Sequence, residues 1–213
     1  MRDFPYPYVL ALLNSRILEF YLKQISPYAS GKYYRYTNEY LSRLPLRKAG
    51  KKTVAEVTGL VLKLMKLTKM LNPNIEEITH GMPLLRKPGV EFDTADKIRL
   101  DSIEITEHEI RLNGGRIKIE DRLLREYIYL YMLWLKKQNK NELRRDEIMK
   151  IPVPNNLREA TEKMSILRET RKQKVLKKIA ELEDELNEII YRLYGINREE
   201  MDIIEAEIWR GHT

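Results

Sequence analysis

The stretch IRLDSIEITEHEIRLNGGRIKIEDRLLREYIYLYMLWLKK, residues 98–137, decides the fold class of this 213-residue chain. In its first half apolar residues alternate with polar ones, as at Ile117 and Ile119. This spacing is typical of strands with one buried face, and the NGG at residues 113–115 supplies a hairpin turn. The second half of residues 120–137 is apolar on most sides, which predicts a helix at the centre of the core. The stretch therefore predicts a small antiparallel β-meander beside a central helix.

Helical spacing of apolar residues flanks this stretch on both sides. Residues 8–24 and 52–71 each predict one helix before it. After it, apolar residues recur at steps of three and four along residues 157–193, which predicts one continuous helix packed lengthwise on another helix. Gly195 is the predicted C-cap of that helix. The predicted fold is α+β, mainly α, with helices around a small antiparallel β-meander and a long C-terminal coiled-coil-like helix.

The surplus of positive charge lies in one part of the chain. Residues 1–87 hold 15 Lys or Arg against 6 Asp or Glu, a balance of +9, whereas residues 88–118 hold 5 against 7 and residues 119–213 hold 19 against 19. Localised positive charge attracts phosphate backbones. We expect three segments: a basic helical recognition segment at 1–87, the meander with its central helix at 88–154, and the long helix with a C-terminal helix at 155–213.

Tyrosines and cations are mixed in the first 50 residues, which hold eight of the 13 tyrosines. Tyrosine offers an apolar face and a hydroxyl, arginine can contact guanine or phosphate with two hydrogen bonds, and lysine adds a point charge. Strand-like alternation would bury at least one tyrosine among residues 33–36. We expect Arg35 to contact a base and Lys32 to contact a phosphate. The candidate DNA-binding residues are Lys32, Tyr33, Tyr34, Arg35, Tyr36 and Arg43.

No catalytic or metal-binding motif accompanies this segment. A glycine-rich donor loop and a P-loop are both missing from the sequence, and without cysteine there is no thiolate zinc site. The three histidines lie far apart and are expected to be structural or surface residues, and the NPN at residues 72–74 predicts the end of a helix. We therefore expect no enzyme activity from this chain alone and no metal ion in it.

The apolar runs are too short for a membrane span. The longest, residues 127–135, is about half the length that a spanning helix needs. The first residues also lack the pattern of a signal peptide, because Asp3 lies in the would-be basic region and no small-residue cleavage site follows. The expected location is the cytoplasm, with no membrane contact.

Two segments carry a family resemblance. Residues 12–46 contain Leu-Leu-Asn-Ser, an aromatic-rich helix, a glycine-containing turn and Leu-Pro-Leu, and residues 186–205 contain Tyr-Arg-Leu-Tyr-Gly followed by an acidic helix. In this order they resemble the C-terminal target-recognition (specificity) domain of TaqI-like type II restriction–modification adenine-N6 DNA methyltransferases. The pattern is also similar to the specificity subunits of type I systems.

The resemblance implies a module that binds duplex DNA and docks with a methyltransferase or nuclease catalytic domain. In such enzymes the catalytic domain holds S-adenosylmethionine and an Asn-Pro-Pro-Tyr site. This chain contains neither the glycine-rich loop that would bind S-adenosylmethionine nor the Asn-Pro-Pro-Tyr site. The resemblance therefore implies no cofactor here and a catalytic part that lies in a longer polypeptide or in another subunit.

Two other functions fit the same residues. The chain could be a helical scaffold that forms a homodimer through residues 157–193, with an incidental basic face. It could also be an RNA-binding module, since tyrosine and arginine stack on single-stranded bases. Salt-dependent binding to duplex DNA would distinguish a DNA-recognition module from a helical scaffold. A preference for single strands would favour an RNA-binding module.

Overall fold

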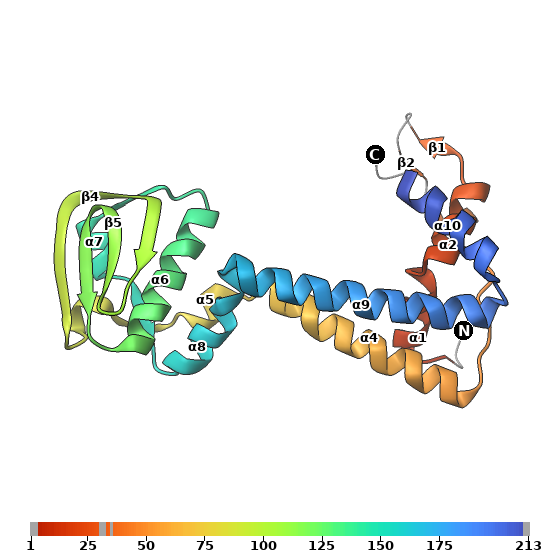
Figure 1. Cartoon of the computed structure of the whole chain (residues 1–213), viewed down its shortest axis with the longest axis horizontal. Helices are drawn as coiled ribbons and strands as arrows, with labels where there is room; N and C mark the ends of the chain where they lie inside the picture. Colours follow the sequence, from red (N-terminus) through yellow and green to blue (C-terminus); the bar gives the residue numbers. More distant parts are fainter. Residues whose placement is uncertain (1–3, 30–32, 35, 211–213) are drawn as a thin grey trace. The chain divides into compact units, whose positions relative to one another are not determined.

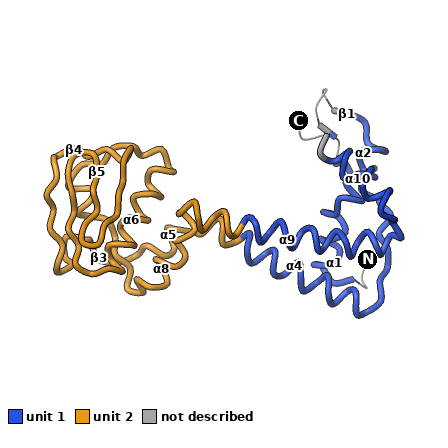
Figure 2. The backbone as a smooth tube through the Cα atoms, in the orientation of Figure 1, with its two compact units in different colours: residues 1–68, 176–213 blue, residues 69–175 orange. Residues whose placement is uncertain are grey.

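The computed structural model describes residues 4–29, 33–34 and 36–210. It contains two compact units, shown in different colours in Figure 2. Unit 1 is formed by Met1–Thr68 with Leu176–Thr213, and unit 2 by Lys69–Val175. Unit 1 thus combines both ends of the chain, and the expected functional division at residues 87 and 154 stays a prediction.

Unit 1 is helical, with one short β-hairpin. Its helix α4, Lys51–Leu71, confirms the helix predicted at residues 52–71. A long C-terminal helix is also present: α9, Glu169–Tyr194, begins in unit 2 and runs through unit 1 to Gly195, whose φ of 74° is that of a helix C-cap. The other elements are α1 Tyr6–Leu13, α2 Arg16–Ile25, β1 Tyr28–Ala29, β2 Tyr33–Tyr34, α3 Asn38–Leu41 and α10 Arg198–Arg210 (Figure 1).

The single helix predicted for residues 8–24 is wrong. The chain forms two helices there, α1 and α2, separated at Asn14 and Ser15. The side chain of Ser15 accepts a hydrogen bond from the backbone N–H of Leu18 and so caps α2. A serine in this position satisfies an N–H group that the first turn of a helix leaves free.

The core of unit 1 joins helices that are far apart in the sequence. One face of α4 and one face of α9 contribute to the same buried cluster, together with side chains from α1, α2 and α10. The apolar steps of three and four along α9 are thereby explained as a helix face packed lengthwise in this core. The residues from α4 and α9 are Val57, Leu60, Val61, Leu182, Leu186, Ile189, Ile190 and Tyr191.

The prediction of one continuous helix over residues 157–193 is also wrong. Helix α8, Leu157–Met164, is followed by a 3-10 turn at Ser165–Leu167, and Arg168 is extended before α9 begins. Tertiary contacts hold this break, because Ile166 is buried and Arg168 Nη2 donates to Glu126 at 3.0 Å. The guanidinium of Arg168 also lies 5.2 Å from the ring of Tyr129.

Unit 2 is the α+β part of the fold. Three antiparallel strands, β4 Val90–Ile105, β5 Glu109–Ile119 and β6 Glu142–Arg144, form a sheet in the order β5-β4-β6. Helix α6, Arg122–Lys137, lies against the sheet and buries Tyr127, Ile128, Leu130 and Met132 in the same cluster, which confirms it as the central helix. The smaller elements are α5 Ile75–Ile78, β3 Gly81–Pro83, a 3-10 turn Leu84–Arg86, α7 Arg145–Met149 and β7 Pro152–Pro154.

The hairpin turn of the meander lies elsewhere than predicted. Strands β4 and β5 are joined through Thr106, whose N–H donates to the carbonyl of Glu109 at 2.9 Å, and the NGG lies inside β5. Gly115 has a φ of 145°, and a Cβ there would lie 2.4 Å from the carbonyl oxygen of Asp93. The register of β4 shifts just beyond Thr94, so the glycines serve a β-bulge instead of a turn.

Candidate nucleic-acid interface

A short hairpin places part of the tyrosine–cation segment at the end of α2. Strands β1 and β2 pair antiparallel, with Tyr28 opposite Tyr34. Lys23, near the end of α2, lies with its Nζ 5.9 Å from the centre of the Tyr34 ring and 2.8 Å from Glu19. The helix and the hairpin are thereby connected through Lys23.

The structure describes only some of the predicted site residues. Lys32 and Arg35 lie outside the described residues, as does the side chain of Tyr33, so their predicted roles stay predictions. Tyr34 is partly buried and Tyr36 is 62% exposed. The expectation that at least one tyrosine of this stretch is buried is met only in part, by Tyr34, and stays a prediction for Tyr33.

Arg43 is the one cation between residues 28 and 46 that lies in the described part of the chain. Its side chain is 59% exposed, pairs with Glu39 at 3.2 Å, and lies 5.9 Å from the ring of Tyr40. Exposed ion pairs of this kind contribute little to stability. The guanidinium of Arg43 can therefore exchange Glu39 for a phosphate at small cost.

Residues 44–47, immediately after Arg43, are held by hydrogen bonds from two tyrosine side chains to their backbone carbonyls. Tyr194 on α9 donates its hydroxyl proton to the carbonyl of Pro45 at 2.6 Å, and Tyr8 on α1 donates to the carbonyl of Arg47 at 2.8 Å. Burial raises the pKa of both tyrosines, so both keep the protons that these bonds require. The Leu-Pro-Leu stretch thus holds one end of the tyrosine–cation segment in place.

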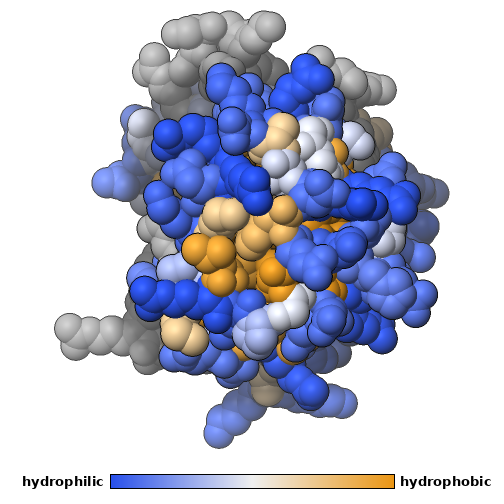
Figure 3. Space-filling view, turned by 90° about the vertical axis from the view of Figure 1, so that its left-hand side faces the viewer, coloured by the Kyte–Doolittle hydropathy of each residue, from blue (hydrophilic) through white to orange (hydrophobic). Residues whose placement is uncertain are grey.

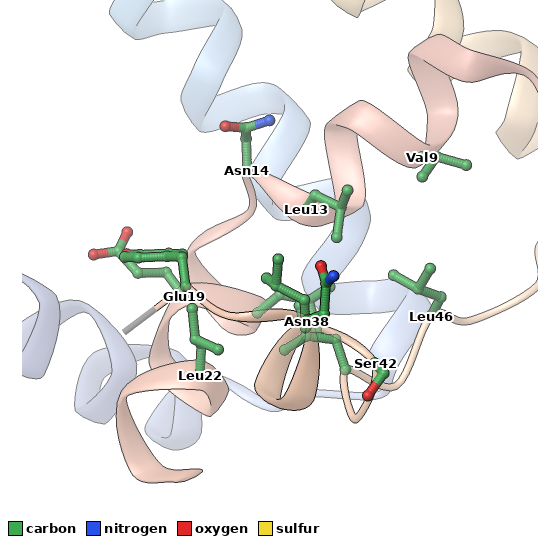
Figure 4. Close-up of a pocket in the computed structure, with 12 residues that line it drawn as sticks. Val9, Leu13, Asn14, Glu19, Leu22, Asn38, Ser42 and Leu46 are labelled. Carbon is green, nitrogen blue, oxygen red and sulfur yellow. The ribbon is translucent and has the colours of Figure 1, made fainter. Parts of the chain in front are cut away.

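An apolar groove lies between this segment and the first two helices. Its cavity volume is about 620 Å³, and it is lined by Val9 and Leu13 of α1, by Leu22 of α2, and by the chain from Tyr36 to Leu46. Figure 4 shows polar side chains from the same elements around it, among them Asn38 and Ser42.

A partly exposed polar network connects α2 to the C-terminal helices. Arg16 donates to Asp184 on α9 at 2.6 Å and to Glu205 on α10 at 2.9 Å, and Tyr191 donates to Glu205 at 2.8 Å. The backbone N–H of Arg16 donates to Asn187 at 2.9 Å. This network gives the helix before the hairpin a rigid base.

Burial and the hydrogen bonds of this network shift the pKa values of Arg16 and Tyr191. Burial alone would lower the pKa of Arg16, but its hydrogen bonds to Asp184 and Glu205 raise it above the usual value. Burial, and then the bond to Glu205, raise the pKa of Tyr191. Both shifts favour the protonated forms that donate in the network, and neither group is poised for proton transfer near neutral pH.

The described residues contain no cluster of metal-ligating side chains. Among residues 4–29, 33–34 and 36–210, no three or more His, Asp or Glu side chains gather where they could hold a metal ion. None of the helices in the same part of the chain is long and apolar enough to cross a membrane. Of the predicted site residues that the structure describes, Arg43 and Tyr36 have exposed side chains.

One family model matches the part of the chain that contains this segment. Residues 2–46 match the family model of the TaqI-like C-terminal specificity domain. The resemblance seen in the sequence is thereby confirmed for that segment, which contains α1, α2, the hairpin and α3. The match does not extend to residues 186–205 or to unit 2. Comparisons with curated proteins and with solved structures gave no match.

Sequence reasoning missed the residues that support this surface. Arg16 lies 168 positions before Asp184 and 189 before Glu205, and no local pattern brings them together. Arg16 lies on the short helix α2, whereas its partners lie on α9 and α10. Helical spacing at the two ends of the chain did not indicate that these helices would share a core.

Proposed function

We propose that this chain is the DNA sequence-recognition module of a restriction–modification adenine-N6 methyltransferase. The observation that carries the proposal is the match of residues 2–46 to the specificity domain, since the tyrosine–cation segment lies within them. Arg35 contacts a base, Lys32 and Arg43 contact phosphates, and Tyr33, Tyr34 and Tyr36 position them. Arginine is assigned to the base because its two parallel donors fit guanine, whereas lysine offers a point charge.

The catalytic part is a separate domain or subunit in this proposal. It holds S-adenosylmethionine and carries out methyl transfer, with or without an attached nuclease, and the present chain docks with it. The complex works in the cytoplasm, and a helix-to-helix homodimer is a further arrangement open to it. A helical scaffold or an RNA-binding protein would share the same charge, so the experiments below include outcomes for both.

Single substitutions at Lys32 and Arg35 should separate the two kinds of contact. Lys32→Ala should weaken binding to all duplexes and flatten the slope of log affinity against log salt by about 0.9, because one fewer counterion is released. Arg35→Ala should cost about 1–3 kcal/mol on the preferred duplex and relax the preference at one base pair. Fluorescence anisotropy at several salt concentrations, on preferred and scrambled duplexes, measures both effects.

Lys150→Ala and Arg144→Ala are matched controls for these two variants. Both side chains are exposed and paired with Asp146, at 3.0 Å and 3.5 Å. Each control removes the same charge from unit 2, so a general effect of net charge would appear in all four variants. If neither Lys32→Ala nor Arg35→Ala differs from its control, the DNA surface lies elsewhere.

A further inference from the structure

The solvent-facing side of α4 carries four exposed lysines without a carboxylate partner. They are Lys51, Lys52, Lys63 and Lys66, all within unit 1. The opposite side of the helix, with Val57 and Val61, lies in the core. Within the described part of the chain no Asp or Glu oxygen lies within 4.0 Å of these four ammonium groups.

Lysines on the sheet and loops of unit 2 behave differently. Four of them pair with carboxylates at 2.7–3.4 Å, so their charges are locally balanced. Figure 3, which looks onto the left-hand side of Figure 1, shows a mainly hydrophilic surface around one apolar area. The paired lysines are Lys97, Lys118, Lys140 and Lys150. The α4 lysines therefore differ from the paired lysines of the sheet and loops, although among the described residues exposed Lys69, Lys174 and Lys177 also have no carboxylate oxygen within 4.0 Å.

The spacing along α4 suits the two strands of a duplex. Lys52 and Lys63 are eleven residues apart, about three helical turns, so they lie on one side of the helix and about 16 Å apart along its axis. The major groove of B-DNA is about 12 Å wide. With their flexible side chains, the lysines at the two ends of this face can reach phosphates on both sides of a groove.

Between the two lysine pairs lie two small residues, Ala55 and the partly buried Gly59, and one exposed carboxylate, that of Glu56. Ala55 is exposed, and a Cβ added at Gly59 would have no other atom within 4 Å, so packing within the chain does not require a glycine. In a helix interior glycine costs about 1 kcal/mol relative to alanine. Close approach of a partner's backbone would account for that cost.

Like Gly59, the residues at the start of α4 lower the stability of the helix. Lys51 and Lys52 occupy the first turn, which contains no acidic residue. The N-terminal end of a helix carries partial positive charge, so cations there are unfavourable and an anion is favourable. Residues that lower the stability of the helix in which they lie are expected where a surface serves binding.

The distribution of charge within unit 1 also favours binding of a polyanion to the part of the chain that contains α4. Residues 1–68 hold 12 Lys or Arg against 4 Asp or Glu, a balance of +8, whereas residues 176–213 hold 5 against 10, a balance of −5. A polyanion is repelled by the second part and attracted to the first. Helix α4 follows the family-matched segment after four residues, two of which are Arg47 and Lys48.

We propose that the lysine face of α4, formed by Lys51, Lys52, Lys63 and Lys66, is a second DNA contact surface that binds duplex phosphates without reading sequence. The inference rests on the proposed function and adds to it. The segment of residues 28–46 reads the sequence, and the lysine face supplies affinity that is the same for every duplex. Phosphate contacts position a protein on DNA, whereas base contacts specify the site.

The direct test replaces all four lysines with glutamine in the full chain. Binding to a 20-bp mixed-sequence duplex is measured by anisotropy at several salt concentrations. The slope of log affinity against log salt should flatten by about 0.9 for each phosphate that the variant no longer neutralises, hence by up to about 3.6. Affinity should fall equally for duplexes of unrelated sequence. The control variant K97Q/K118Q/K140Q/K150Q has the same net charge and should keep the wild-type slope.

Each outcome supports or overturns the inference. If the wild type binds duplex with a steep salt dependence and the α4 variant keeps that slope, the inference is wrong while the proposed function stands. If the wild type binds no duplex at low salt, the proposed function fails and this inference fails with it. Polyglutamate and vesicles of phosphatidylserine and phosphatidylcholine serve as competing probes. Binding to either that depends on the four lysines, with duplex binding unchanged, would also overturn the inference.

A single substitution at Gly59 tests the close approach independently. Gly59→Ala should raise the melting temperature, weaken duplex binding at every salt concentration and leave the slope unchanged, because no charge is removed. A variant that is more stable and binds duplex as tightly as the wild type would contradict the placement of DNA at Gly59.

Discussion

Replacing Leu182 with alanine should lower the free energy of unfolding by about 2–4 kcal/mol. Leu182 lies on α9, is 5% exposed, and belongs to the cluster that contains Val57 and Val61 of α4. Truncation removes buried apolar contacts and leaves a cavity that the surrounding helices can fill only in part. Urea unfolding followed by helical circular dichroism measures the change.

Leu176 provides the matched control on the same helix. It is 37% exposed, so Leu176→Ala should change the free energy of unfolding by about 0.5 kcal/mol or less. Equal effects of the two substitutions would contradict a buried face of α9 in the core of unit 1. A destabilisation at Leu182 alone supports the arrangement of the two long helices described above.

Gly81→Ala should destabilise unit 2 by about 1–3 kcal/mol or more. Strand β3 pairs with β7, and Gly81 faces Pro154 in the register of the two strands. A Cβ at this position would lie 1.7 Å from the carbonyl oxygen of Val153 and 2.3 Å from its carbonyl carbon. These are backbone atoms of a buried strand, so the alanine cannot be accommodated without moving β7 away from β3.

Gly59→Ala is the control for this substitution, with the opposite expected sign. No atom lies within 4 Å of a Cβ at Gly59, so alanine should stabilise α4 by about 0.5–1 kcal/mol. Thermal unfolding of the two variants beside the wild type compares them directly. An unchanged or raised stability for Gly81→Ala would contradict the close pairing of β3 with β7.

The elements that the sequence predicted well are those with a strong periodic pattern. Alternation in β4 and β5 and the apolar surface of α6 both follow from burial against a single core. Breaks inside helical patterns were missed for two different reasons. The break before α2 depends on capping by Ser15, a local signal that apolar spacing hid. The break before α9 depends on contacts of Arg168 with Glu126 and Tyr129, which no local pattern contains.

The residue types of the candidate site were predictable from the sequence. The polar network that connects α2 to the C-terminal helices was not. Tyrosines and cations in residues 25–46 were visible in the sequence, and their family resemblance is confirmed by the match to residues 2–46. The network of Arg16 with Asp184 and Glu205 depends on a fold that joins the two ends of the chain. The roles of Lys32 and Arg35 remain predictions, since both lie outside the described residues.

Selection from a pool of random duplexes tests the central claim most directly. The full chain is incubated with duplexes that contain a randomised central stretch, and the bound fraction is sequenced over several rounds. The proposal predicts enrichment of one short sequence. Arg35→Ala should lose that enrichment at one position, and the variant without the four α4 lysines should select the same sequence with weaker affinity. A bound pool with the composition of the input, or displacement of duplex by an equal concentration of single-stranded RNA, would contradict it.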